Sequence, residues 1–152
     1  MRTSRQEGNL PESEEGTTIR IDIPADLQYL NVVGEAIRGL MRREVELENA
    51  DEVIHGVELA VHEACTNIIK HAYGWRDGRI EIVMTIAADP HRVIVETFDS
   101  GRSFDLESVQ PPDLDAVQDR GYGIFLMRQL MDEVAYQATS QHNRWRLVKR
   151  IA

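Results

Sequence analysis

Apolar and polar residues alternate in patterns that predict the first elements of this chain. Isoleucine occupies every second position of residues 19–23 between polar neighbours, which is the period of a half-buried strand, and Pro24 ends that strand. From Asp26, whose side chain is suited to cap a helix, apolar residues recur at helical spacing to about Leu47. The folded part of the chain is therefore expected to begin with a strand and an amphipathic helix.

A second amphipathic helix is predicted next. It should begin after Asn49 or Asp51, since both residue types suit a helix N-cap. It should end near Tyr73, because Gly74 supplies the left-handed turn that closes many helices. Its apolar stripe predicts packing against a core, and a polar stripe beside it would lie at the edge of that core.

The remaining apolar runs predict strands and one short helix. Residues 78–88 and 92–101 are rich in β-branched residues and are joined by a turn-forming segment, so they are interpreted as two strands. Residues 124–131 predict a short helix, and residues 134–152 predict a hairpin that turns around 141–143. We therefore expect an α/β fold, a two-layer sandwich in which about three helices cover one face of a mixed, mostly antiparallel sheet.

Two segments lack the periodicity of regular elements. Residues 1–16 are polar and predict a mobile N-terminal tail, which precedes a single domain over residues 17–152. Residues 105–120 contain two adjacent prolines and five acidic residues without a regular apolar spacing. This second segment predicts a loop between the strand expected at 92–101 and the short helix expected at 124–131.

Composition limits the classes of function. The 26 acidic and 17 basic side chains give a net charge of −9, which argues against general nucleic-acid binding and favours protein partners. The single cysteine, Cys65, has no partner for an internal disulfide and is expected to be a small buried hydrophobe. Because the chain shows neither a signal peptide nor an apolar run near the roughly 18 residues of a membrane span, we expect a cytoplasmic protein.

The segment ELAVHEACTNIIKHAYG, at residues 58–74, carries the first candidate chemistry. Glu63 and Asn67 lie four positions apart, so on a helix they are neighbours on one face. An isolated pair of this kind is usually solvated, but a carboxylate base beside a magnesium-holding amide is also part of many nucleotide sites. The segments downstream decide between these two interpretations.

Two glycine motifs follow that pair. FDSGRSFD places Asp99 and Gly101 at the end of an apolar strand, and RGYGIFLMRQLMDEV places Gly121 and Gly123 at the start of an apolar helix. The N-terminus of a helix presents backbone N–H groups and the positive end of the helix dipole, which together favour phosphate. With the acid and amide upstream, these motifs predict that the chain binds ATP.

The order and wording of these motifs resemble the GHKL (Bergerat-fold, HATPase_c) family of ATP-binding domains. HEACTNIIKHAYG, DSGRSFD and GYGIFLMRQLMDEV are most similar to its anti-sigma-factor serine-protein kinases, which act in bacterial partner-switching systems. The resemblance covers roughly residues 17–152. It implies the Bergerat-type fold and a kinase or ATPase site built from the three motifs.

The resemblance also implies roles for the polar residues. Glu63 would be the catalytic base, and Asn67 would hold Mg²⁺ through its amide oxygen. Asp99 would accept a hydrogen bond from the exocyclic amine of adenine, while Gly101 would let the backbone approach the base. The chain departs from many relatives at Ser103, where they have a second glycine.

The phosphate end of the nucleotide would be held by the third motif. Gly121 and Gly123 would present their N–H groups to the phosphates. Arg120, the nearest fixed cation, would pair either with a phosphate or with Asp119 and solvent. Residues 105–120 would correspond to the lid that covers ATP in this family.

The function implied is that of an ATP- and Mg²⁺-dependent serine/threonine-protein kinase. It would phosphorylate a small antagonist protein of the STAS type and sequester a sigma factor, as a homodimer. Two alternatives stay open: a nucleotide-gated protein-binding regulator without phosphotransfer, and an ATP hydrolase in which Glu63 orients water. A histidine-kinase catalytic domain is disfavoured, because no helical pair with a phospho-acceptor histidine precedes residue 17.

Other candidate motifs are rejected. The sequence around His62 and Glu63 lacks the second histidine of a zinc-protease motif, because Thr66 stands at its position. No GxxxxGK[ST] motif occurs, and GYGIFL lacks the third glycine of a dinucleotide-binding fingerprint. His71, Trp75 and Trp145 are interpreted as packing residues, although Trp75 follows a glycine and could contribute to a protein interface.

Overall fold

The computed structural model describes residues 16–105 and 122–152, which form five strands and the helices packed on them. The strands are β1 (Gly16–Pro24), β2 (Arg79–Ala87), β3 (Arg92–Asp99), β4 (Glu133–Ala138) and β5 (Asn143–Arg150). Their order in the sheet is β1-β2-β3-β5-β4, and each neighbouring pair is antiparallel. The described part of the sheet is thus antiparallel throughout. This confirms the expected antiparallel character, whereas the parallel pairing that a mixed sheet would contain does not occur among the described strands.

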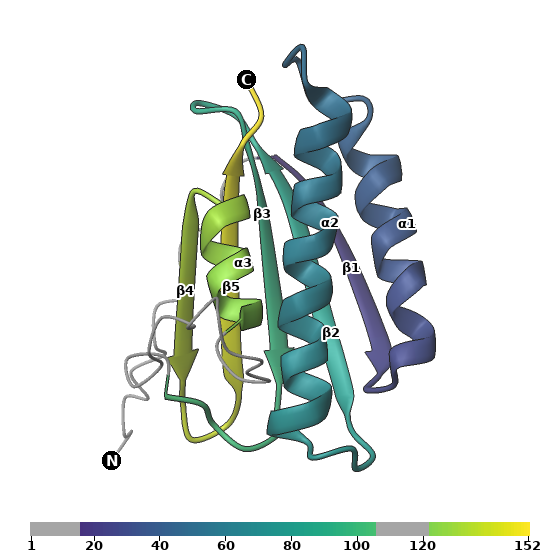
Figure 1. The fold of residues 1–152 in the computed structure, drawn as a ribbon, viewed down its shortest axis with the longest axis vertical. Helices are drawn as coiled ribbons and strands as arrows, with labels where there is room; N and C mark the ends of the chain where they lie inside the picture. Colours follow the sequence, from purple (N-terminus) through teal and green to yellow (C-terminus); the bar gives the residue numbers. More distant parts are fainter. Residues whose placement is uncertain (1–15, 106–121) are drawn as a thin grey trace, which may run out of the picture.

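The helices lie together on one face of this sheet (Figure 1). They are η1 (Leu27–Tyr29), α1 (Leu30–Met41), α2 (Ala50–Asn67), the π-helical η2 (Ile68–Ala72) and α3 (Tyr122–Leu130). The main core fills the space between the two layers, with Val57, Ile82 and Leu147 among its fully buried side chains. This arrangement confirms the predicted two-layer α/β sandwich with three main helices.

The other face of the sheet carries charged side chains in cross-strand pairs. Arg20 on β1 lies 3.2 Å from Glu81 on β2, and Arg144 on β5 pairs with Glu96 on β3. Alternation along a strand sends successive side chains to opposite faces, which explains the strict pattern of isoleucines and polar residues in β1. A small cluster of Ala87, Ile94 and Val148 is buried on this second face.

The first helix begins as predicted but ends earlier. The Asp26 carboxylate accepts a hydrogen bond from the backbone N–H of Gln28 at 3.1 Å, so Asp26 caps the helical segment. The predicted end near Leu47 is wrong, because α1 stops at Met41. The N–H groups of two residues beyond the helix both bond to the Met41 carbonyl, and the chain turns there.

The second helix confirms the predicted boundaries. It begins after Asn49, and helical structure continues through η2 to Ala72. Gly74 closes it with φ +57°, and Trp75 is also left-handed, with φ +66°. The Trp75 N–H bonds to the carbonyl of Ile69 at 2.9 Å, which fixes this turn.

Four single residues were predicted to pack in the core, and the structure confirms two of them. Cys65 and Trp145 are buried in the main core, as predicted. His71 is exposed, so its assignment as a packed residue is wrong: in the π-helical η2 the buried positions are Ile68 and Ile69. Trp75 is 62% exposed and does not serve as a core residue either.

The predicted N-terminal tail and lid fall largely beyond the described residues. β1 begins at Gly16, the last residue assigned to the tail, and residues 1–15 are not described. The same holds for residues 106–121, which include nearly all of the predicted lid. Across the described ranges, no helix combines the length and apolar character needed to cross a membrane.

Candidate functional site

The acid and amide of α2 meet the glycine motif at the start of α3. Glu63 and Asn67 are both partly buried, one turn apart near the C-terminal end of α2, where α3 packs against it. A methyl group added to Gly123 would place its carbon 2.7 Å from Oε2 of Glu63 and 3.8 Å from Nδ2 of Asn67. The fold therefore brings together three residues that were selected from two separate sequence motifs.

This cluster lies at the edge of the core. The apolar side of α2 is buried under the sheet, with Ala60 and Ala64 fully inaccessible. Glu63 and Asn67 lie beside that stripe and keep partial access to solvent. A carboxylate in such a position can exchange a proton with a bound molecule, and the amide side chain of Asn67 lies near the same glycine.

The Asp-Ser-Gly turn forms a second, more deeply buried cluster at the end of β3. Asp99 is only 4% exposed. Its Oδ1 accepts hydrogen bonds from the Gly101 backbone N–H at 3.0 Å and from Nδ2 of Asn143 at 2.9 Å. The same Asn143 nitrogen also donates to the Gly101 carbonyl at 2.9 Å. Asp99 and Gly101 are thus tied to each other and to the first residue of β5.

Burial raises the pKa of Asp99 above its ordinary value, against the opposing effects of the Asn143 and Gly101 hydrogen bonds and of nearby His142. A carboxyl whose folded-state pKa is raised stabilises the fold most at low pH, and this contribution is lost as the pH rises through the raised pKa. The ionised form of Asp99 therefore costs folding free energy. Buried carboxyls with a shifted pKa occur often at functional sites, and Asp99 stays a candidate of that kind.

Gly101 is required by close packing against η2. A methyl group there would place its carbon 2.6 Å from the carbonyl carbon and oxygen of Ala72. The N–H of Arg102 donates to that same Ala72 carbonyl at 2.8 Å. The π-helical turn, a feature often found at functional sites, therefore holds the Asp-Ser-Gly turn beside the end of α2.

Tyr73 joins the same two segments from the other side. Its hydroxyl donates to the Arg79 carbonyl at 2.6 Å and accepts from the Ser100 N–H at 3.0 Å. Its ring occupies the space above Gly78, where an added methyl carbon would lie 2.4 Å from the ring. The tyrosine therefore fixes the start of β2 and the turn after β3 relative to α2.

Two predicted site residues, Arg120 and Gly121, lie outside the described ranges, and their positions stay predictions. Sequence reasoning missed both Tyr73 and Asn143 as residues that shape the site. Asn143 was noticed only as part of a turn, because its role depends on the register that places it opposite Asp99. That register is set by the pairing of whole strands, and no local motif signals it.

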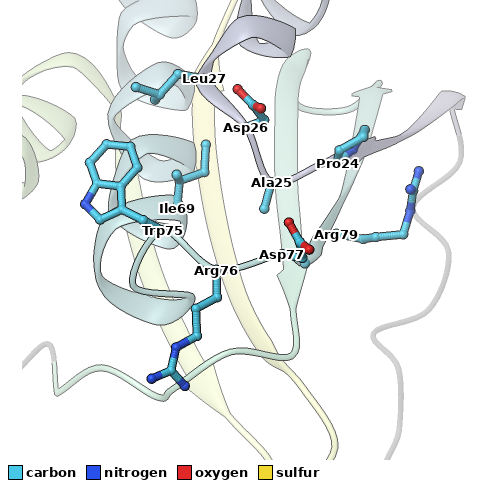
Figure 2. Close-up of a pocket in the computed structure, with 10 residues that line it drawn as sticks. Pro24, Ala25, Asp26, Leu27, Ile69, Trp75, Arg76, Asp77 and Arg79 are labelled. Carbon is cyan, nitrogen blue, oxygen red and sulfur yellow. The ribbon is translucent and has the colours of Figure 1, made fainter.

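A separate cleft of about 640 Å³ lies beside the loop that follows η2 (Figure 2). Its lining residues are Pro24, Ala25, Asp26, Leu27, Ile69, Trp75, Arg76, Asp77, Gly78 and Arg79. None of the predicted site residues that the structure describes lines this cleft. The candidate site is the region between α2, α3 and the Asp99 turn, where the described site residues lie.

Comparison with known proteins identifies the family of the chain. The family described as the histidine kinase-like ATPase domain matches residues 23–149. The serine-protein kinase RsbW of Bacillus pumilus (strain SAFR-032) is 32% identical over 131 residues, which are 80% of this chain and 79% of that protein. RsbW of Bacillus subtilis (strain 168) is 31% identical over 128 residues, or 78% and 77% of the two chains.

A solved structure shares the fold. The RsbU and RsbW domains of Rv1364c from Mycobacterium tuberculosis match with a TM-score of 0.64 at 16% identity, over 89% of this chain and 32% of that chain. The family match covers both the Glu63–Asn67 helix and the Asp99 turn, and the RsbW relatives match over most of their own length. The chain therefore belongs to the histidine kinase-like ATPase domain family, in the group of the serine-protein kinases named RsbW.

Proposed function

We propose that this chain is an ATP- and Mg²⁺-dependent serine/threonine-protein kinase of the anti-sigma-factor type. The observation that carries the proposal is the convergence of Glu63, Asn67 and Gly123 at the junction of α2 and α3. Because the chain belongs to a family of ATPase domains and has relatives that are serine-protein kinases, we interpret these three residues as parts of an ATP site.

In this proposal the Asp99 turn binds the adenine end of ATP. The ionised carboxylate accepts a hydrogen bond from the exocyclic amine, which offsets the cost of burying the charge. The phosphates extend toward the N-terminus of α3, where the backbone N–H groups of Gly121 and Gly123 favour anionic groups. Gly123 faces Glu63 and Asn67, so the terminal phosphate would lie near both.

Asn67 fits a role in holding Mg²⁺. Its side chain is partly buried beside Glu63 and offers a neutral amide oxygen. Mg²⁺ is commonly bound by one or two protein oxygens together with substrate phosphates. When bound, Mg²⁺ neutralises charge on the β- and γ-phosphates.

Glu63 would act as the general base for transfer. Its carboxylate accepts the proton of a serine hydroxyl on the protein substrate while the serine oxygen forms a bond to the γ-phosphorus. The bond between that phosphorus and the bridging oxygen breaks, and ADP leaves. The partial burial of Glu63 beside α3 limits competition from water at this step.

The macromolecular partners follow from the same proposal. The phosphorylated protein would be a small antagonist of the STAS type, and the chain would sequester a sigma factor when the antagonist is phosphorylated. We further propose a cytoplasmic homodimer. The net charge of −9 supports protein partners over nucleic acid.

Asp99→Asn should weaken ATP binding by about tenfold to a hundredfold, because hydrogen bonds to charged groups contribute roughly 1.5–3 kcal/mol. Titration calorimetry with MgATP measures the change. The free energy of unfolding without nucleotide should not fall, since the amide removes a buried charge and keeps an acceptor for Gly101 and Asn143. Asp77→Asn, an exposed acid in the loop after η2, is the matched control and should bind ATP normally. Unchanged affinity in Asp99→Asn would remove Asp99 from the nucleotide site.

Gly123→Ala should slow phosphotransfer by about tenfold to a hundredfold while leaving the fold intact, because small displacements of catalytic groups have effects of this size. The added carbon meets the flexible end of Glu63, which can move away without disturbing the backbone. Gly39→Ala is the control, since a methyl group at Gly39 on α1 has no neighbour within 4 Å. A transfer rate equal to that of the control would show that Gly123 does not shape the position of Glu63.

A further inference from the structure

Asn143 is a buried residue beside Asp99 to which the proposed nucleotide site gives no role. It is the first residue of β5, is only 3% exposed, and lies directly opposite Asp99 in the register of β3 and β5. A buried amide must satisfy its polar atoms locally. Its side-chain nitrogen does so with two bonds, one to Oδ1 of Asp99 and one to the Gly101 carbonyl, each of 2.9 Å.

The chemistry of these partners fixes the orientation of the amide. A carboxylate and a carbonyl are both acceptors, so only the NH₂ group of Asn143 can face them. Oδ1 of Asp99 then accepts two hydrogen bonds, from Asn143 and from the Gly101 N–H. The two bonds to Oδ1 hold the orientation of the whole carboxylate, and among the described residues none is found to Oδ2.

We propose that Asn143 is a positioning residue that orients the Asp99 carboxylate toward the base and thereby sets the preference for adenine over guanine nucleotides. The inference rests on the proposed function, because it assumes that Asp99 faces the base of a bound nucleotide. It adds a residue that touches neither the nucleotide nor the transferred phosphate. Its action is exerted through the Asp99 carboxylate and the turn at Gly101, to which it donates hydrogen bonds.

The preference follows from the groups at one position of the purine ring. Adenine carries an amine there and donates a hydrogen bond, whereas guanine carries a carbonyl oxygen, which is an acceptor. A fixed carboxylate oxygen pairs with the donor and leaves the acceptor unpaired and repelled, a situation that gives strong discrimination. A carboxylate that is free to rotate can turn away from guanine, so the discrimination should fall when Asn143 is lost.

The test compares ATP and GTP affinity in four full-length proteins: wild type, Asn143→Ala, Asn143→Asp and the control Val148→Ala. Asn143→Ala removes both hydrogen bonds, and Asn143→Asp keeps the size of the side chain but replaces the donor with a second carboxylate. Val148 lies on the same strand in the small cluster on the opposite face of the sheet, so its truncation lowers stability without touching Asp99. Calorimetry gives the dissociation constants, and thermal unfolding verifies that each protein is folded.

Both Asn143 variants should lose about tenfold to a hundredfold of the ATP:GTP affinity ratio, the size expected for hydrogen bonds to a charged group. Val148→Ala should keep the wild-type ratio despite its lower stability. A wild-type ratio in folded Asn143→Ala or in folded Asn143→Asp would overturn the inference and leave the proposed kinase function standing. A wild-type protein that binds neither nucleotide would instead overturn the proposed function, and the inference with it.

Discussion

Glu63→Gln should slow phosphorylation of a serine-bearing antagonist by about 10²–10⁴, the usual contribution of a general base. The amide has nearly the shape of the carboxylate but accepts no proton from the serine hydroxyl. ATP binding should stay within a few-fold of wild type, because in our proposal the base contacts the hydroxyl and not the nucleotide. Single-turnover transfer assays and calorimetry separate the two quantities.

The matched control for this variant is Glu52→Gln. Glu52 is an exposed acid in the first turn of the same helix, far along α2 from Glu63, and its substitution should leave transfer unchanged. Binding of a sigma factor should survive in Glu63→Gln, since nucleotide binding is retained. Phosphorylation at the wild-type rate in Glu63→Gln would contradict the mechanism and would favour a nucleotide-gated binding module.

Asn67→Ala should abolish detectable phosphotransfer and remove the gain in ATP affinity that Mg²⁺ provides. The variant lacks the amide oxygen that would hold Mg²⁺ against the phosphates, and this contact is needed both for binding and for transfer. ATP titrations with Mg²⁺ and with a chelator measure the Mg²⁺-dependent part of the affinity. Binding in the chelator should be equal in Asn67→Ala and wild type.

Two further variants make the Asn67 prediction specific. Asn67→Asp restores an oxygen ligand and should recover part of the Mg²⁺-dependent affinity. Asn31→Ala removes an exposed amide from α1 and should behave as wild type. A full Mg²⁺-dependent gain in Asn67→Ala would exclude Asn67 as a ligand.

Much of the fold follows from sequence periodicity. The isoleucines of β1 and the apolar stripe of α2 predicted elements whose boundaries the structure confirms closely, because both patterns reflect burial on one face. Gly74 was likewise a reliable marker of the helix end, since its φ of +57° is one that glycine adopts without strain. The fold brings Glu63 and Asn67 close to Gly123, residues of two of the three ordered motifs, while their roles stay predictions.

Other features depend on contacts distant in sequence. α1 ends at Met41 although apolar residues continue to Leu47, because the chain turns and Glu46 donates its N–H to the carbonyl of Ile151 near the C-terminus. The bridge from Asn143 to Asp99 requires the β3–β5 register, and a single sequence does not specify it.

We propose above all that the chain transfers the γ-phosphate of ATP to a serine of an antagonist protein. The most direct measurement incubates the chain with γ-labelled ATP, Mg²⁺ and candidate STAS-type antagonists, and then maps the labelled residue. We predict phosphoserine on one antagonist with wild-type protein and none with Asn67→Ala. Bound ATP without any labelled protein, or label released only as free phosphate, would contradict the claim.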